Sequence, residues 1–408
     1  MDSVASAANQ QAHSARWSDE ILAKLYHRIL DRIDAGLTVG SMEIVPPDGR
    51  VRTLGGRAPG PSCSIIIRDW RALSRLAWSG SNGLYEGWAA GEWFSADPVP
   101  FFELVMRNRQ SIGTVGRAKG WQRIVKRMAH RQNRNTKPNA QRNIMAHYDL
   151  GNDFYAAWLD PTMSYSSAIF ANGDDLEAAQ RRKQAAVLDR LKLAPGASML
   201  EIGCGWGSLA AAARARGASV TAISLSPSQL EYARAHHDSA IDFELCDYRD
   251  VVGTFDAIAS VEMVEAVGEH YWPAYLDTLS RCLKSGGRAA IQYISIADDV
   301  FEAYRDNADF IQTYIFPGGM LLSESRFRTL AEARGLAWTD RHSFALDYAD
   351  TLKIWHERFN LATLPDAFDK RFKDLWNFYL QYCEGGFRGG GIDVLQVTLV
   401  KGMSRCAD

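Results

Sequence analysis

The sequence predicts an α/β fold, in which a parallel sheet is covered by helices on both faces, with a smaller α+β domain before it. From about residue 180, short apolar runs alternate with segments of helical periodicity, which is the pattern of βαβ units. Before residue 112, strand-like runs flank a Pro-Asp-Gly turn at 47–49 and adjoin amphipathic helical segments. A chain of 408 residues has room for both domains.

The small N-terminal domain is expected over 16–112, after a polar stretch at 1–15 that we expect to be disordered. Apolar residues recur at helical spacing from Trp17 to Ile33. The segments predicted after this helix are strands within 37–51 and 63–70 and helices within 70–80 and 98–108. Because aromatic side chains are dense in this domain, we expect it to present lipid or to mediate docking.

A basic linker is expected at 113–142, where nine Lys and Arg residues occur without any Asp or Glu. Two interpretations of this segment stay open. It is a solvated linker, or it docks on anionic phospholipid headgroups at about 1 kcal/mol per basic residue. The stretch GWQRIVKRMAH places Trp121, Ile124, Val125 and Met128 among the charges, as in an interfacial amphipathic helix.

The bulk composition argues against several classes of protein. The net charge of −2 gives no overall attraction to nucleic acid. No basic segment followed by an apolar run marks a secretory signal, and no apolar stretch reaches the about 18 residues of a spanning helix. The six cysteines form no CxxC pair or metal-binding spacing. We therefore expect a cytoplasmic protein without a metal site, whose contact with a membrane is peripheral.

The larger domain is expected over 143–402. Its predicted helices are 176–193, 206–217 and 226–237, with Ser226 as the N-cap of the last. Its predicted strands are 198–203, 219–226, 241–247, 255–261 and 287–295. Because helices alternate with strands here, the sheet is predicted to be parallel and covered on both faces.

Three glycines follow the first of these strands, in the sequence LEIGCGWGSLA at 200–210. Gly203, Gly205 and Gly207 let the backbone approach a ligand where the strand passes to a helix N-terminus. The spacing E-x-G-x-G-x-G differs from the dinucleotide motif G-x-G-x-x-G and is the form found in Rossmann-like methyltransferases. The pattern therefore predicts S-adenosylmethionine as the ligand, although a tight turn alone gives the glycines a structural reason.

Two further segments occur where such a fold contacts this ligand. The sequence ISLS ends the second strand, where ribose contacts are placed, and CDYRD follows the third strand, on the adenine side. Because the glycine turn, ISLS and CDYRD occur in the expected order, together they predict a methyltransferase.

Several long segments resemble the family of cyclopropane-fatty-acyl-phospholipid synthases and mycolic acid methyltransferases. They are HYDLGNDFYAAWLDPTMSYSSAIF at 147–170, EIGCGWGSLA at 201–210, SVEMVEAVGEHYWPAYL at 260–276, YIFPGG at 314–319, DYADTLKIWHERF at 347–359 and FYLQYCEGGFRGGGIDVLQVTLVKG at 378–402. Because they occur in the family's order over about 140–402, the resemblance is specific. It implies a Rossmann-like class I methyltransferase sheet with helical lipid-binding insertions.

The resemblance implies methyl transfer from S-adenosylmethionine to the cis double bond of an unsaturated phospholipid acyl chain, at the inner face of the membrane. An alkene is a poor nucleophile, so the site must align it with the sulfonium methyl group. The site must also exclude water, because water would trap the resulting carbocation. A base then removes a proton and a cyclopropane ring closes. In this family a bound bicarbonate ion is that base.

The resemblance also assigns residues to the cofactor site, position by position. Tyr165 and Ser166 match a Tyr-Ser pair, and Ser224 and Gln229 match contacts at the second strand. The full predicted set is Tyr165, Ser166, Glu201, Gly203, Cys204, Gly205, Gly207, Ser224, Gln229, Asp247 and Tyr248. Each polar member has an alternative role as a helix cap or a turn residue.

The base site departs from the family pattern at two positions. Glu265 and Tyr348 match a Glu and a Tyr of the bicarbonate pocket, with the backbone of Ile294 as a further contact. Ser167 and Gln292 stand where the family has Cys and His. Both can hydrogen-bond an anion, but neither titrates near neutrality as His does. Bicarbonate therefore binds in an altered pocket, or another base acts, for which Glu265 is the best side-chain candidate.

Two of these assignments carry alternatives. Glu265 is otherwise a structural carboxylate in an acidic helix with Glu262 and Glu269. Cys383, in QYCEGGFRGGG, matches a cysteine that the family assigns to the active site. Because no base for its thiol is evident, we expect it to line the pocket.

Functional alternatives also stay open. Methyl transfer leads to ring closure, or a hydride shift gives a methylene- or methyl-branched chain instead. The basic segment and YIFPGG argue against a methyltransferase of small amines or hydroxyls. The intact glycine turn argues against a non-catalytic lipid-binding protein with a vestigial fold. The sequence leaves a homodimer open.

Overall fold

The computed structural model describes residues 23–112 and 150–402. Its contacts divide the chain into two compact units, Met1–Gln122 and Arg123–Asp408, and each unit has its own fold. The predictions for the polar stretch 1–15 and for the basic segment 113–142 concern residues outside the described ranges. Within those ranges, no helix is both long and apolar enough to pass through a bilayer.

The first unit combines a four-stranded sheet with helices. Its strands are β1 (Ser41–Val45), β2 (Arg52–Gly55), β3 (Ser62–Ile67) and β4 (Trp93–Phe94), in the order β2-β1-β3-β4. Its helices are residues 23–36, α2 (Arg71–Ser79), α3 (Ser81–Ala89) and α4 (Val99–Arg107). Helix α3 was not predicted, since glycines interrupt its sequence. Gly83 instead permits close packing, because an added Cβ would lie 2.0 Å from the carbonyl oxygen of Arg75 on α2.

The second unit is built on a seven-stranded sheet. Its strands are β5 (Ser198–Ile202), β6 (Ser219–Ser224), β7 (Asp242–Leu245), β8 (Phe255–Val261), β9 (Leu283–Ile296), β10 (Leu336–Ser343) and β11 (Ile392–Lys401), in the order β10-β11-β9-β8-β5-β6-β7. Strands β5 to β9 pair in parallel, as predicted. The purely parallel prediction was incomplete, because β11 pairs antiparallel with both β9 and β10. Neither β10 nor β11 was predicted as a strand.

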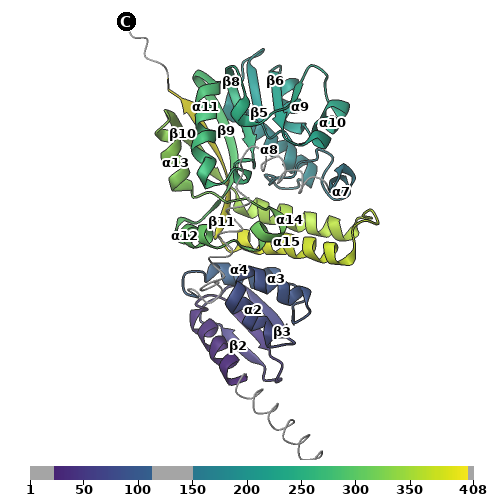
Figure 1. Ribbon diagram of the computed structural model, residues 1–408, viewed down its shortest axis with the longest axis vertical. Helices are drawn as coiled ribbons and strands as arrows, with labels where there is room; N and C mark the ends of the chain where they lie inside the picture. The colour runs from purple at the N-terminus through teal and green to yellow at the C-terminus, as the bar shows by residue number, and fades with distance from the viewer. Residues whose placement is uncertain (1–22, 113–149, 403–408) are drawn as a thin grey trace, which may run out of the picture. The chain divides into compact units, whose positions relative to one another are not determined.

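Helices cover both faces of this sheet (Figure 1). The helices of the second unit are α7 (Asn152–Ala156), α8 (Leu176–Leu191), α9 (Ser208–Ala215), α10 (Pro227–His236), α11 (Trp272–Cys282), α12 (Asp298–Asp306), α13 (Glu324–Glu332), α14 (Ala345–Leu361) and α15 (Lys370–Arg388). Helices α8, α9 and α10 pack on one face, and α11 and α13 on the other. Met199 and Leu200, neighbours on β5, are buried against opposite faces because side chains alternate along a strand. Ser226 caps α10, as predicted.

The strand order creates a ligand position at the carboxyl ends of the central strands. From β5 the chain passes through α9 to β6 on one side, whereas β8 lies on the other side of β5. Where the connections from two neighbouring strands run to opposite sides, a crevice forms outside the carboxyl ends of those strands. Ligands bind in this crevice in open α/β sheets. The residues that follow β5, β6 and β8 therefore converge there.

Two long helices near the C-terminus, α14 and α15, lie side by side (Figure 1). They share a cluster of aromatic rings with the short helix α7. The buried members of this aromatic cluster are Phe154, Tyr155, Trp158, Trp355, Phe359, Trp376 and Tyr379. The sequence analysis predicted helical insertions but gave no residue ranges for them. In the structure these helices supply an apolar region beside the sheet.

Candidate active site

The glycine turn after β5 forms one wall of a pocket. Gly203, Gly205 and Gly207 have φ angles of 82°, 53° and 91°, which side chains disfavour. At Gly203 an added Cβ would lie 2.7 Å from Met263 Cγ, and at Gly207 it would lie 2.8 Å from His237 Cδ2. At Gly205 it would meet open space. The turn therefore needs glycine for its backbone at all three positions and for close packing at two of them.

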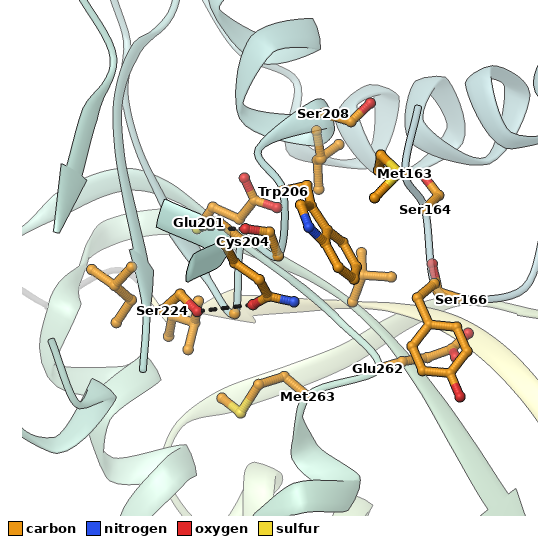
Figure 2. Close-up of a pocket in the computed structure, with 18 of the residues that line it drawn as sticks. Met163, Ser164, Ser166, Glu201, Cys204, Trp206, Ser208, Ser224, Glu262 and Met263 are labelled. Carbon is orange, nitrogen blue, oxygen red and sulfur yellow. Dashed lines mark hydrogen bonds between the residues drawn. The ribbon is translucent and has the colours of Figure 1, made fainter. Parts of the chain in front are cut away.

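Most of the predicted cofactor residues meet in this pocket. The predicted residues that line it are Tyr165, Ser166, Glu201, Gly203, Cys204, Gly205, Ser224, Gln229 and Tyr248. In Figure 2, Glu201 and Ser224 lie on one side of the pocket and Ser166 on the other. The pocket thus collects residues from the ends of β5 and β6 and from the loop after α7.

Two buried polar atoms of the pocket lack a partner among the described residues. They are Oε2 of Glu201 and Nε2 of Gln229. The hydroxyl of Ser224 donates to Oε1 of Gln229 at 3.2 Å, and the Nε2 end of this amide is the one left without a partner. Burial raises the pKa of Glu201 to about 8. Buried polar groups are normally hydrogen-bonded, so this pocket suits a ligand with both donors and acceptors.

Asp247 and Gly207 are not among the residues that line the pocket. The carboxylate of Asp247 accepts hydrogen bonds from Arg249 Nε at 2.8 Å and Nη2 at 2.5 Å. Asp247 also caps the short 3-10 turn η1 (Tyr248–Asp250), which carries the pocket residue Tyr248. Gly207 packs against His237, as described above. Both predicted residues thus support the pocket wall in this structure.

Helix α8 supplies polar pocket residues that the sequence analysis missed. Lys183 Nζ donates to Ser166 Oγ at 2.5 Å, and Gln184 Nε2 donates to Ser208 Oγ at 2.8 Å. Burial lowers the pKa of Lys183 to about 8, against the effect of nearby carboxylates. A signal was present in the sequence. Gln180, Lys183 and Gln184 lie on the buried stripe of α8, where an apolar residue is expected.

Helix α7 holds the tryptophan of the glycine turn. Trp206 lines the pocket, and its indole Nε1 donates to Oδ1 of Asn152 at 2.8 Å. Nδ2 of Asn152 donates in turn to the backbone carbonyl of Ser228 at 3.2 Å. Asn152 lies in the segment HYDLGNDF, which the sequence analysis had used only for the resemblance. It connects α7, the glycine turn and α10.

Three of the predicted base-site residues donate hydrogen bonds to the carboxylate of Glu262, which was not predicted as a site residue. The backbone N–H of Ser167 donates to its Oε1 at 2.9 Å, and Gln292 Nε2 donates to the same oxygen at 2.8 Å. The Tyr348 hydroxyl donates to Oε2 at 2.8 Å. Glu262 also lines the cofactor pocket, on the side of Ser166 in Figure 2. It therefore joins the cofactor pocket to the predicted base site.

The Ser167 hydroxyl makes a different hydrogen bond from the one predicted for it. We expected it to donate to an anion, but it donates to the backbone carbonyl of Ala168 at 2.9 Å. The backbone N–H of Ser167 provides the donor instead. A signal for Glu262 was its position directly after β8, at the carboxyl end of a parallel strand.

Glu265 contacts the predicted backbone donor but lies outside this convergence. Its Oε1 accepts from the N–H of Ile294, and its buried Oε2 has no partner among the described residues. Burial, and then the charge of Glu262, raise the pKa of Glu265 to about 8, so it is mostly protonated at neutral pH. The predicted acidic helix is absent from this described stretch, because Glu265 and Glu269 lie in two short 3-10 turns.

Cys383 on α15 is not among the residues that line the cofactor pocket. Burial raises the pKa of its thiol, and the nearby charge of Asp309 raises it further. A buried neutral thiol is a poor nucleophile, which argues against a chemical role for Cys383, and the pocket-lining role expected for it stays a prediction.

The aromatic cluster reaches the cofactor pocket through Tyr165. Its ring lies 5.6 Å from that of Trp158 and 5.3 Å from that of Trp355. Its hydroxyl lies 2.9 Å from the hydroxyl of Tyr379 on α15. A water-poor, aromatic region therefore borders the pocket beside Ser166 and Glu262.

A model of the family described as mycolic acid cyclopropane synthetase matches residues 135–397. The chain belongs to this family. The match spans nearly all of the second unit, including the glycine turn, Glu262 and the helices α14 and α15. The family predicted from the sequence is thus confirmed.

Relatives of this chain match it over both units. The tuberculostearic acid methyltransferase UfaA1 of Mycobacterium tuberculosis is 37% identical over 400 residues, covering 93% of this chain and 91% of the relative. The cyclopropane-fatty-acyl-phospholipid synthase of Escherichia coli K12 is 35% identical over 358 residues, covering 86% and 90%. The crystal structure of mycolic acid cyclopropane synthase CmaA1 with SAH and CTAB matches with a TM-score of 0.60 at 29% identity, covering 64% of this chain and 98% of that one.

This member of the mycolic acid cyclopropane synthetase family is therefore an S-adenosylmethionine-dependent lipid methyltransferase. The predicted fold class and enzyme class are confirmed. The relatives' names include both a cyclopropane synthase and a fatty acid methyltransferase, so membership alone does not fix the product.

Proposed function

We propose that this protein transfers a methyl group from S-adenosylmethionine to the cis double bond of an unsaturated phospholipid acyl chain. One observation carries the proposal: a single pocket contains the glycine turn and the half-buried Glu262 and borders the aromatic cluster. When bound, S-adenosylmethionine supplies a methyl group made electrophilic by its sulfonium sulfur. A weak nucleophile such as an alkene reacts only when it is aligned with that group in a dry site.

The pocket suits this methyl donor in its polar groups. The donor carries hydroxyl, ammonium and carboxylate groups, and the pocket offers an unpartnered carboxyl oxygen on Glu201 and an unpartnered amide N–H group on Gln229. The Ser166 hydroxyl, which also lines the pocket, adds a further polar contact. We infer that these residues, with Tyr165, Ser224 and Tyr248, hold the donor.

The aromatic cluster suits the acyl chain and the cation formed on it. Trp158, Tyr165 and Trp355 form a buried wall next to the pocket. Aromatic faces attract positive charge, and apolar surface excludes the water that would trap a carbocation. Methylation of a small polar amine or hydroxyl would not need such a wall.

We propose ring closure to a cyclopropane as the outcome, with a methylene- or methyl-branched chain as the alternative. The relative at 37% identity is named a methyltransferase, while the relative at 35% identity is named a cyclopropane synthase. The altered base site, with Ser167 and Gln292, is the specific observation that favours keeping the branched product as a second candidate.

The test supplies purified protein with S-adenosylmethionine and vesicles of a dioleoyl phospholipid, followed by mass spectrometry of the fatty acids. We expect one CH₂ unit to be added, in a product that resists catalytic hydrogenation if the ring has closed. A product that takes up hydrogen identifies the branched outcome. Methylation of an added amine, with the lipid unchanged, would refute the proposal.

A further inference from the structure

The Glu262 carboxylate accepts hydrogen bonds from three groups around it. A backbone N–H and a phenol hydroxyl donate from Ser167 and Tyr348, and Lys183 lies near enough to interact electrostatically. Three charge-assisted hydrogen bonds orient both carboxylate oxygens. Such a set of donors would bind a small oxyanion. In this protein the carboxylate of Glu262 occupies the space between them.

The orientation of the third donor, Gln292, is fixed by a chain of hydrogen bonds. Arg190 Nε donates to Gln396 Oε1 at 3.1 Å, and Gln396 Nε2 donates to Gln292 Oε1 at 3.0 Å. Arginine has no acceptor, so the two amides have only one consistent orientation. The NH₂ group of Gln292 therefore faces Glu262. Gln292 and Gln396 are fully buried neighbours on β9 and β11, so this arrangement belongs to the sheet itself.

The backbone at Glu262 is in a conformation that glycine would adopt more easily. Its φ is 48°, in the left-handed region, at a cost of about 1–2 kcal/mol for a residue with a Cβ. Its own N–H donates to the carbonyl of Gln292 at 2.8 Å, which holds the turn in place. A glutamate at a position that favours glycine indicates that the carboxylate is needed there.

We propose that Glu262 is the catalytic base of this enzyme, so that its carboxylate occupies the place of a free bicarbonate ion and receives the proton from the transferred methyl group. This inference rests on the proposed function. Glu262 lines the cofactor pocket, whereas Glu265 does not and is mostly protonated at neutral pH. Burial favours proton uptake by Glu262, while its three hydrogen bonds keep it aligned.

The step balances without any further reagent. The alkene's π electrons form the new C–C bond as the C–S bond breaks, and the C–S pair stays on sulfur. Glu262 takes one proton of the new methyl group. The C–H electron pair then closes the ring, or, after a 1,2-hydride shift, forms the methylene double bond. The same base therefore serves both products.

The test compares wild-type protein with Glu262→Gln and Glu262→Gly in buffer freed of carbon dioxide. We expect wild-type turnover to be unaffected by removal of bicarbonate and Glu262→Gln to lose about 100-fold or more. Glu262→Gly should be equally impaired and should recover when bicarbonate or formate is added. Calorimetry with S-adenosylhomocysteine checks that each variant still folds and binds, and the exposed Glu302→Gln is the matched control.

A binding measurement separates failure of this inference from failure of the proposed function. ¹³C-bicarbonate, followed by NMR line broadening, should bind to Glu262→Gly and not to the wild type, whether or not a lipid is methylated. Bicarbonate binding to the wild type, or a wild type whose turnover requires bicarbonate, would overturn the inference. So would a Glu262→Gln variant with undiminished turnover, or a Glu262→Gly variant that takes up no bicarbonate. Absence of lipid methylation by the wild type would count against the proposed function alone.

Discussion

Gln396 is a residue whose importance comes only from what it does to another residue. It lies on β11, is fully buried, and points its NH₂ group at Gln292 because Arg190 holds its oxygen. Gln292 then presents its own NH₂ group to Glu262. Gln396 is therefore a positioning residue for the proposed base.

We predict that Gln396→Glu impairs the reaction by reversing the Gln292 amide. A carboxylate at 396 cannot donate, so Gln292 would turn its NH₂ group toward it and its oxygen toward Glu262. The lost hydrogen bond would raise the pKa of Glu262, because hydrogen bonds to a carboxylate favour its charged form. The lower limb of the pH–rate profile should therefore move to higher pH. Gln396→Met, which removes the donor without adding an acceptor, should give a smaller shift, and equal shifts would contradict this account.

The raised pKa of Glu265 also predicts how the stability of the protein changes with pH. Burial raises the pKa of Glu265 from 4.5 to about 8. Between these values the folded state binds more protons than the unfolded state, so the free energy of unfolding falls as pH rises. We predict that Glu265→Gln reduces this fall by up to about 1.4 kcal/mol per pH unit. Urea unfolding between about pH 5 and 8 measures the slope. Parallel curves for the two proteins would show that Glu265 ionises normally.

At the scale of elements, two helices outside the βαβ repeat shape the cofactor pocket. Helix α8 brings Lys183 and Gln184 to the loop residues Ser166 and Ser164 and to the start of α9. Helix α7 brings Asn152 to Trp206. The pocket is thus closed by side chains from neighbouring elements, while the turn supplies its backbone.

We predict that Asn152→Ala weakens binding of S-adenosylhomocysteine several-fold. The change removes the acceptor of the Trp206 indole N–H, and a hydrogen bond of this kind contributes about 0.5–1.5 kcal/mol. Isothermal titration calorimetry measures the affinity. Asn360→Ala on α14, which removes only an exposed hydrogen bond to its own helix, is the control and should bind as the wild type does. Equal affinities for all three proteins would show that α7 does not position the turn.

At the scale of the whole molecule, the substrate proposed here lies in a membrane, so the protein must reach a lipid surface. We propose that the basic segment 113–142, outside the described residues, provides this attraction at the cytoplasmic face. Its nine positive charges act on anionic headgroups within about a Debye length, so salt should weaken the association.

We predict that charge reversal at Arg123, Lys126 and Arg127 lowers the affinity for anionic vesicles about 100-fold or more, at about 1 kcal/mol per residue. Affinity for S-adenosylhomocysteine should stay unchanged, because the pocket residues are untouched. Co-sedimentation with anionic and with neutral vesicles measures the first effect. If the variant binds anionic vesicles as strongly as the wild type does, the segment is a solvated linker and does not dock on the membrane.

The sequence by itself determined the parallel core of the sheet and the glycine turn, because both depend on local features. The alternation of apolar strands and amphipathic helices from 176 to 261 follows from residues close in the chain, and so does the cap at Ser226. The positive φ angles of Gly203 and Gly207 likewise follow from a turn only a few residues long. Strands β10 and β11 were not predicted, although IDVLQVTLVK at 392–401 is rich in the β-branched residues that favour strands, and only their antiparallel pairing depends on residues far apart in the chain.

Only the tertiary structure decided which carboxylate occupies the base site. Glu262 and Glu265 are three residues apart and chemically identical, and although Glu262 directly follows β8, that position does not show which side chains contact it. Their difference comes from partners distant in sequence, since Ser167, Gln292 and Tyr348 surround the first and Ile294 contacts the second. Hydrogen bonds between residues about 30 to 95 positions apart exist only once the sheet has brought β8 and β9 together with α14 and the loop after α7. Burial in the same assembly raises the pKa of both carboxyls, while the hydrogen bonds from Ser167, Gln292 and Tyr348 act in the opposite direction at Glu262 alone.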